Sequence, residues 1–152
     1  MLKDAESGNA VAAALARLVA DGFVLRFLTE LSLWHHDEKI ITQTELLRQL
    51  KIMLDELILA VACRLKVLGG CAPQTLAEIQ ALSSVRVKPN QGVASAPFLH
   101  LADEIGSMHN VCRMVAAIAR KDGDKLTEQL LREMISSLEE MSIRVNQSAR
   151  LQ

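Results

Sequence analysis

Hydrophobic residues recur every three to four positions along four long stretches of the chain, which is the period of an α-helix with one buried face. The stretches cover residues 11–33, 42–68, 101–119 and 126–145. The second carries a nearly continuous stripe, formed by Leu47, Leu50, Leu54, Leu57, Val61, Leu65 and Leu68. The pattern predicts an all-α chain of four long helices.

Three breaks separate these stretches. Thr42-x-x-Glu45 fits a capping box, so we expect the second helix to begin near Thr42. Gly69-Gly70 ends the same stretch, as glycine does after a helix C-terminus. The segment 121-KDGD-124 predicts a tight turn before the last helix.

Residues 71–97 form a long connection that contains all three prolines of the chain. Within it, residues 74–82 (QTLAEIQAL) predict a short helix. A connection of this length is unusual in a compact domain and indicates a crossover that runs the length of a bundle. A short link, a long crossover and a second short link together predict an all-α, ferritin-like four-helix bundle whose crossover carries a short helix.

The composition agrees with a helical core. Half of the residues are hydrophobic but only 3% are aromatic, so Leu, Ile, Val, Ala and Met must fill the interior. A chain of 152 residues suits one domain. We expect residues 10–148 to form the bundle, between a flexible N-terminal tail at 1–9 and a C-terminal tail at 149–152.

The charge and the cysteines narrow the class of protein. A formal net charge of −1 indicates neither nucleic acid nor an anionic membrane as a partner. We expect no leader, since residues 1–9 are polar, and no apolar run reaches the ~20 residues that a bilayer span needs. Cys63, Cys71 and Cys112 are odd in number, so we expect reduced thiols in a cytoplasmic protein.

The segment 64-RLKVLGGCAPQTLAEIQALSS-84 resembles the Dps family of miniferritins. In that family an arginine, an apolar residue and LGG end a long helix, and a short crossover helix then ends near SS. The segment 120-RKDGDKLTEQLLREMISSLEE-140 is similar to the family's turn into its last helix. The resemblance implies a hollow dodecamer that oxidises Fe(II), stores iron and protects against stress. It also implies DNA coating as an activity of several members.

The resemblance further implies an oxidation site at a two-fold interface. One subunit gives two histidines, and the other gives an aspartate and a glutamate four residues apart. Matched on Gly69-Gly70 and on Trp34, these four positions hold Leu33, Thr44, Leu59 and Cys63. Fe(II) prefers carboxylate and imidazole ligands, which none of the four supplies. The ExxH motif of larger ferritins is missing as well. We therefore expect no usual ferroxidase centre, and no enzyme unless an unconventional site takes its place.

Residues 57–63 (LILAVAC) are apolar in succession, so this part of the second helix is apolar on all sides. Such a helix is expected to be buried on all sides. One side faces the core of the bundle. We expect the other side to form a subunit interface through Leu59, Val61 and Cys63.

By the same resemblance, Asp124 and Glu128 lie at positions of an acidic pore through the cage. The neighbouring positions hold Lys125 and Gln129, which weaken the negative field. Steering of cations toward the pore is expected to be reduced but not abolished.

The best remaining ligand cluster is His35, His36, Asp37 and Glu38, which follow the first helix. Imidazole and carboxylate groups are ligands for Zn, Fe and Mn, so these residues are a candidate metal site. The alternative is a solvated polar loop. His100 and Glu104 are a second candidate pair, for which a hydrogen bond or ion pair on a helix surface is the alternative.

Three functions remain open from the sequence. The first is a Dps-like passive cage of iron storage and stress protection, a homo-oligomer expected to be a 12-mer. The second is a miniferritin that oxidises Fe(II) at an unconventional site in residues 35–38. The third is a DNA-coating structural protein, which residues 1–9 support poorly, since they hold Lys3 against Asp4 and Glu6. Iron is the only metal that the resemblance implies, and nothing indicates a membrane partner.

Overall fold

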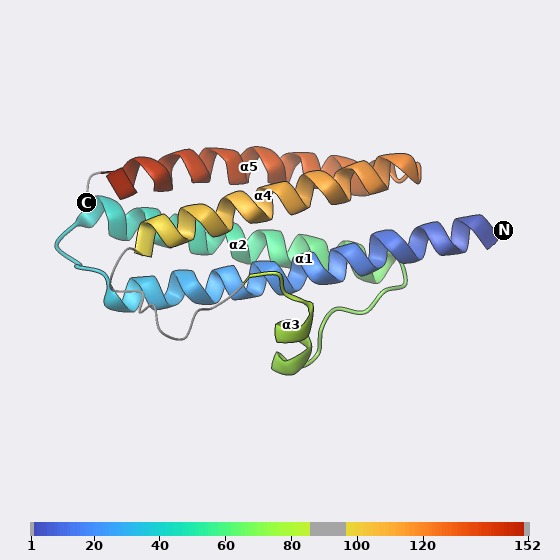
Figure 1. The fold of residues 1–152 in the computed structure, drawn as a ribbon, viewed down its shortest axis with the longest axis horizontal. Coiled ribbons are helices and arrows are strands. Elements are labelled where there is room, and N and C mark those ends of the chain that lie inside the picture. Colours follow the sequence, from blue (N-terminus) through green and yellow to red (C-terminus); the bar gives the residue numbers. More distant parts are fainter. Residues whose placement is uncertain (1, 86–96, 151–152) are drawn as a thin grey trace.

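A computed structural model describes residues 2–85 and 97–150 of the chain, and these residues form five helices and no strand. Four helices are long and one is short (Figure 1). In chain order they are α1 (Leu2–His35), α2 (Ile41–Val67), α3 (Leu76–Leu82), α4 (Pro97–Lys121) and α5 (Lys125–Arg150). The predicted all-α fold is confirmed.

The long helices form two antiparallel pairs. A short loop joins α1 to α2, and a tight turn joins α4 to α5 (Figure 1). The chain leaves α2 at one end of the bundle and enters α4 at the other, so the connection between them crosses the whole length of the bundle. The short helix α3 lies on this connection, outside the four-helix core and against α1. This is the predicted ferritin-like connectivity.

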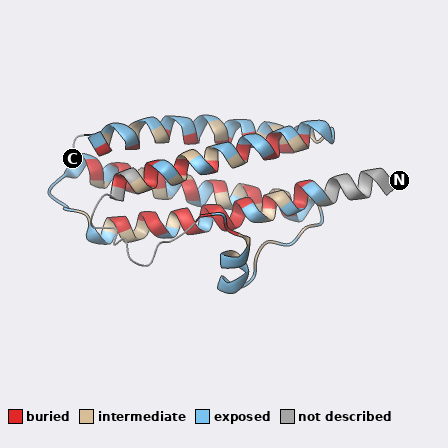
Figure 2. Ribbon diagram, viewed as in Figure 1, coloured by how far each residue is buried: buried red, intermediate tan, exposed pale blue. Residues whose placement is uncertain are grey.

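The core lies between the four long helices, where buried residues line their inner faces (Figure 2). It is built mainly from leucine, as the composition predicts. The largest fully buried side chains are Phe98, Leu15, Leu18, Leu25, Leu47, Leu50, Leu54, Leu65, Leu101, Ile105, Met108 and Leu131. Phe98 is the one aromatic residue among them.

Glycine ends two of the long helices in the same way. Gly69 follows α2 with φ 79°, and the Gly70 N–H donates to the Leu65 carbonyl at 2.9 Å. Gly123 follows α4 with φ 75°. These are Schellman motifs, which favour glycine because other residues are strained at positive φ. Gly70 has a second constraint, since a Cβ there would lie 2.3 Å from Leu65 Cδ1.

The predicted capping box at the start of α2 is wrong. The helix begins at Ile41, and its N-cap residue is Ile40, whose side chain makes no capping hydrogen bond. A threonine cap stands at α3 instead, where the Glu78 N–H donates to the Thr75 hydroxyl at 3.1 Å. The Glu78 carboxylate in turn accepts from the Gln74 N–H at 2.6 Å. These two hydrogen bonds therefore stabilise the start of α3, because a helix this short is marginal without them.

Helical structure continues into both segments that were predicted as tails. The helix α1 begins at Leu2 and α5 ends at Arg150. The domain boundaries at residues 10 and 148 stay predictions. Residues 86–96 of the predicted crossover lie outside the described residues. Within the described part of the chain, no helix is both long and apolar enough to cross a bilayer.

Candidate functional site

Leu33 and Thr44, which stand where the resemblance places two histidines, line one hollow between the end of α1 and the start of α2. We call it the loop hollow. It encloses about 380 Å³ and is lined by Leu33, Glu38, Ile41, Thr44, Glu45 and Arg48. The sequence comparison thus brought together two residues that are neighbours in space.

The described lining of the loop hollow fits an iron centre poorly. It contains two carboxylates, but also the guanidinium of Arg48 and the apolar side chains of Leu33 and Ile41. The Thr44 hydroxyl donates to the Ile40 carbonyl at 3.2 Å, within its own helix. A cation beside the carboxylates opposes binding of another cation, and no imidazole is present in this lining.

Leu59 and Cys63, the other two matched positions, point away from the core on the outer face of α2. Leu59 is 66% exposed. Fifteen residues separate it from Thr44, which places the two side chains about 22 Å apart along the helix. The two pairs of positions therefore cannot meet within one chain. Only a second chain can bring Leu59 and Cys63 over the loop hollow.

One residue of the predicted interface was placed wrongly. Val61 is 0% exposed and belongs to the core of this chain, in line with Leu57 and Leu65. A side chain that is already fully buried cannot contact another subunit. Residues 57–63 are apolar on both sides of α2, but the sides differ, since Leu59 and Cys63 face outward and Val61 inward.

The structure does not gather the four polar residues of the loop into a ligand set. His35 is the last residue of α1 and is exposed. His36 places its ring edge-on to Phe98, with centroids 5.9 Å apart, and its Nε2 lies 3.4 Å from the Ile40 carbonyl. The Asp37 carboxylate accepts from the Lys39 N–H at 3.0 Å, so it shapes the loop.

No group of three or more His, Cys, Asp or Glu side chains that could hold a metal occurs among residues 2–85 and 97–150. Neither the loop cluster nor the pair His100 and Glu104 is therefore part of such a group. Glu38, the last residue of the loop cluster, faces the loop hollow with Glu45 and Arg48. The loop residues thus act in the structure as a turn and as one wall of a hollow.

The two predicted pore residues are both held by arginine. Asp124 lies 2.8 Å from Arg64 and accepts a 3.1 Å hydrogen bond from the Thr127 N–H and another from the Thr127 hydroxyl. Burial alone would raise the pKa of Asp124. The hydrogen bonds from Thr127 and the charge of Arg64 outweigh burial and hold this pKa below its usual value.

Glu128 contacts two arginines, Arg120 and Arg132, each at 2.8 Å. The hydrogen bond from Arg120 is the largest cause of the lowered pKa of Glu128. With Lys125 and Gln129 it borders an open hollow of about 380 Å³. Both carboxylates stay ionised, but their charges are balanced at short range, which weakens any field that they project into a pore.

A buried carboxylate that the sequence analysis did not single out fastens the crossover to α1. Asp21 is 2% exposed and accepts hydrogen bonds from the Ser83 hydroxyl at 3.0 Å, the Ser84 N–H at 2.7 Å and the Ser84 hydroxyl at 3.0 Å. We call this set the Asp21 latch. A charged residue between the core residues Leu18 and Leu25 is the sequence signal that could have found it.

The Asp21 latch also affects a neighbouring thiol. Cys112 is 0% exposed, and its burial, with a smaller effect from the Asp21 charge, raises the thiol pKa to about 12. A thiol with such a pKa is inert at neutral pH. Cys112 acts as a small core residue.

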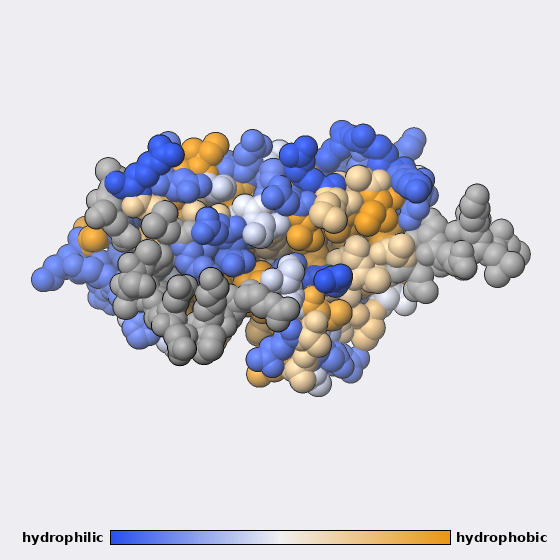
Figure 3. All heavy atoms as spheres, viewed as in Figure 1, coloured by the Kyte–Doolittle hydropathy of each residue, from blue (hydrophilic) through white to orange (hydrophobic). Residues whose placement is uncertain are grey.

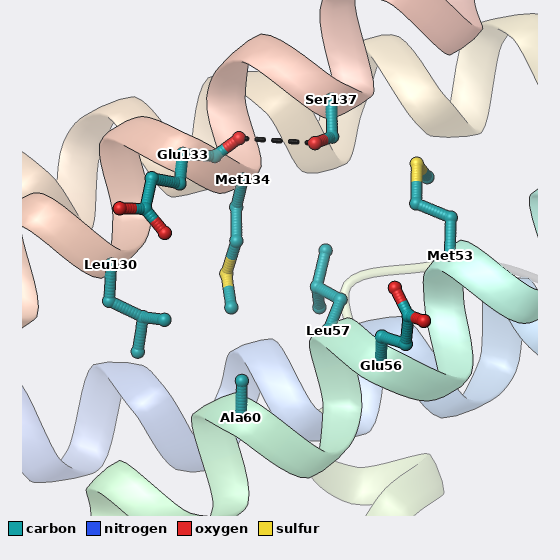
Figure 4. Close-up of a pocket in the computed structure, with 8 residues that line it drawn as sticks. All are labelled: Met53, Glu56, Leu57, Ala60, Leu130, Glu133, Met134 and Ser137. Carbon is teal, nitrogen blue, oxygen red and sulfur yellow. Dashed lines mark hydrogen bonds between the residues drawn. The ribbon is translucent and has the colours of Figure 1, made fainter.

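A groove between α2 and α5 has carboxylates and thioethers in its wall (Figure 4). It encloses about 200 Å³. Its lining residues are Met53, Glu56, Leu57, Ala60, Leu130, Glu133, Met134 and Ser137. Met134 reaches toward α2, whereas the carboxylates of Glu56 and Glu133 point toward different ends of the groove (Figure 4). They do not converge on one ion.

No protein-family model matches the chain, and no curated protein matches it. Several solved structures have the same fold. Antigen TpF1 from Treponema pallidum superposes with a TM-score of 0.87 at 20% identity, over 95% of this chain and 94% of that one. The DPS protein from Vibrio cholerae O1 gives 0.85 at 18% identity, over 97% and 92%. DpsC from Streptomyces coelicolor gives 0.86 at 24% identity, over 94% and 85%.

These comparisons confirm the expected architecture. The chain has the ferritin-like fold of the Dps structures along nearly its whole length. The Vibrio cholerae protein is described as a member of a broad superfamily of ferritin-like diiron-carboxylate proteins. Identities below 25% show the fold and leave the chemistry to the residues of this chain.

Proposed function

We propose that this protein is a Dps-like shell protein of iron storage and stress protection that lacks the usual ferroxidase centre and serves as a passive cage. The observation that carries the proposal is the lining of the loop hollow. Where the resemblance places histidines, the hollow has Leu33 and Thr44, and Arg48 adds a positive charge. Fe(II) finds no imidazole in this lining, and the Arg48 charge opposes its binding to the two carboxylates.

The outward positions of α2 support the same conclusion. Leu59 and Cys63 replace the expected carboxylates on a surface that only a second chain can bring to the loop hollow. An apolar side chain in such a contact avoids the burial of an unpaired carboxylate, which would cost several kcal/mol. Leu59 and Cys63 therefore do not supply the expected carboxylate ligands, but they suit a contact between subunits. Iron would be cargo of the cage and not a resident cofactor.

The proposal includes self-assembly into a closed homo-oligomer, expected to be a 12-mer, in the cytoplasm. The described cysteines are free thiols, which agrees with a reducing compartment. DNA coating is not part of the proposal, because the formal net charge is −1 and residues 1–9 hold one lysine against one aspartate and one glutamate.

The test is aerobic oxidation of Fe(II), followed by absorbance at 310 nm, on protein whose mass has been measured by light scattering. A passive cage gives a large particle and oxidation no faster than buffer. Rapid oxidation that is lost in the double variant His35→Ala and His36→Ala would establish the unconventional site instead. A monomer in solution would overturn the shell itself.

A further inference from the structure

The end of α4 and the start of α5 carry an excess of positive charge on one exposed face. The open hollow of about 380 Å³ at this place is lined by residues spaced three or four apart, which lie on one face of α5. They are Lys125, Glu128, Gln129 and Arg132. Arg120 joins them from α4 through its contact with Glu128. In the view of Figure 3, hydrophilic residues gather over the turn between the two helices. We call these residues together the basic cluster.

Glu128 holds two guanidiniums close together. Arg120 Nε and Arg132 Nη2 each donate to the same oxygen, Glu128 Oε1, at 2.8 Å. Because both nitrogens lie at this distance from one atom, they stand within about 6 Å of each other. Two guanidiniums at this separation repel one another, and one carboxylate balances only one of the two charges. A second anion at this place would balance the other.

The opposite charges of the basic cluster differ in their exposure. The side chain of Glu128 is 16% exposed, whereas those of Arg120 and Arg132 are 65% and 60% exposed. A ligand that arrives from solvent therefore meets guanidinium before it meets carboxylate. A guanidinium has five N–H donors, and among the described residues each of the two arginines forms its ion pair with Glu128 alone. The remaining nitrogens can donate to the oxygens of a ligand.

The charges around the basic cluster do not cancel its excess. Lys125 adds a third cation to the hollow, and it forms no ion pair within residues 2–85 and 97–150. Lys121 and Asp122, both exposed in the preceding turn, have opposite charges. Asp124 is already paired with an arginine of α2. Glu133 lines the separate groove between α2 and α5. Three cations thus stand against one carboxylate.

We propose that the basic cluster binds a phosphate-like oxyanion, held from the solvent side by the guanidiniums of Arg120 and Arg132 and by the ammonium group of Lys125. Guanidinium matches phosphate oxygens through two parallel hydrogen bonds, and ammonium adds a point charge. The resemblance implies a carboxylate that attracts cations at Glu128, whereas this carboxylate instead sets two arginines in place for an anion. All of these side chains belong to one chain, so the site goes beyond the proposed function and does not need a shell.

The extent of the basic cluster favours a small, free oxyanion over nucleic acid. Lys125 and Arg132 are separated by two turns of α5, or about 10 Å. Proteins that bind a nucleic acid backbone contact several phosphates along it, over a longer basic surface. The formal net charge of −1 gives this chain no general attraction for a polyanion. Inorganic phosphate has the charge and the size that one compact cluster can bind.

The site is tested by isothermal titration calorimetry of the full chain with inorganic phosphate, in a buffer whose ionic strength is held constant with sodium chloride. We expect saturable binding to the wild type. In the double variant Lys125→Gln and Arg132→Gln, the affinity should fall at least about tenfold, because charge-assisted hydrogen bonds are lost. The matched control is Lys39→Gln with Arg150→Gln, which removes the same charge from exposed residues of the α1–α2 loop and the end of α5. The control should bind phosphate as the wild type does.

The single variant Arg132→Lys separates a built site from diffuse charge. Lysine keeps the charge but lacks the planar fork, so phosphate binding should weaken while far-UV circular dichroism shows unchanged helix content. Undiminished binding by this variant, equal losses in the double variant and its control, or no binding by the wild type would each overturn the site. Retardation of plasmid DNA that is lost in Lys125→Gln would also overturn it, since the cluster would then serve nucleic acid.

The outcome is independent of the shell. Phosphate binding by a monomeric protein would leave the oxyanion site standing while the shell proposal fails. An assembled protein that does not bind phosphate would give the reverse result.

Discussion

The Arg64 guanidinium, near the end of α2, donates a 2.8 Å hydrogen bond to the carboxylate of Asp124, just before α5 begins. Sixty residues separate the two in sequence. The contact ties the first helical pair to the second at the end of the bundle where both α2 and α4 stop. Asp124 also caps α5 through the Thr127 N–H at 3.1 Å. One carboxylate thus serves two helices.

Removal of this carboxylate should destabilise the fold. In Asp124→Asn, the amide oxygen can still accept from the Thr127 N–H, but Arg64 loses its charged partner, so we expect the free energy of unfolding to fall by about 1–2 kcal/mol. Urea denaturation at fixed protein concentration measures the change. Asp122→Asn, in the same turn but exposed, is the control and should differ little from the wild type. Equal stability of the two variants would show that Asp124 contributes no more than a surface residue.

The same contact predicts a pH dependence. The pKa of Asp124 is lower in the folded chain than in the unfolded chain, so its contribution is complete above the unfolded value, which is about 4. It is lost as the pH falls through the lowered folded value. The difference in unfolding free energy between the wild type and Asp124→Asn should therefore be constant near pH 7 and shrink below about pH 4. A difference that grows in acid would contradict this assignment.

Two glycines should respond in opposite ways to alanine. A Cβ at Gly70 would lie 2.3 Å from Leu65 Cδ1 and 3.3 Å from Ala12 Cβ, so Gly70→Ala should cost about 1–3 kcal/mol. A Cβ at Gly106, within α4, meets nothing within 4 Å. Gly106→Ala should raise stability by up to about 1 kcal/mol, because alanine favours the helix. Thermal unfolding of both variants checks the signs.

Imidazole and carboxylate ligands at the four matched positions should restore the oxidation of Fe(II). In the variant with Leu33→His, Thr44→His, Leu59→Asp and Cys63→Glu, imidazole and carboxylate ligands stand where the resemblance places them. We expect this variant to oxidise Fe(II) faster than the wild type, as measured at 310 nm. Variants with only the first two or only the last two changes are the controls and should stay inactive. Activity of either half alone would contradict a site shared between two chains.

The architecture was predictable because helix periodicity and glycine breaks are local signals. The stripe from Leu47 to Leu65 marks the inner face of α2, and Gly69 and Gly123 end helices as expected. Val61 was assigned both to this stripe and to the subunit interface, because seven apolar residues in succession hide which side of the helix faces the core. Its spacing of four from Leu57 and from Leu65 places it inward.

The candidate site was predictable only in part. Leu33 and Thr44 were matched one by one and share one hollow in the structure. The partners of Asp124 and Asp21 could not be foreseen, since they are brought close by the packing of helices about 60 residues apart. The capping box was assigned to α2 because Thr42-x-x-Glu45 and Thr75-x-x-Glu78 have the same pattern, and only the backbone distinguishes them.

The separation of Thr44 and Leu59 along one rigid helix has a consequence for mixtures of chains. Each complete site in the restored protein needs a histidine half from one chain and a carboxylate half from another. When restored and wild-type chains assemble together at random, both contributors must be of the restored kind. Activity should then fall with the square of the restored fraction, so half-restored cages would retain only about a quarter of the sites.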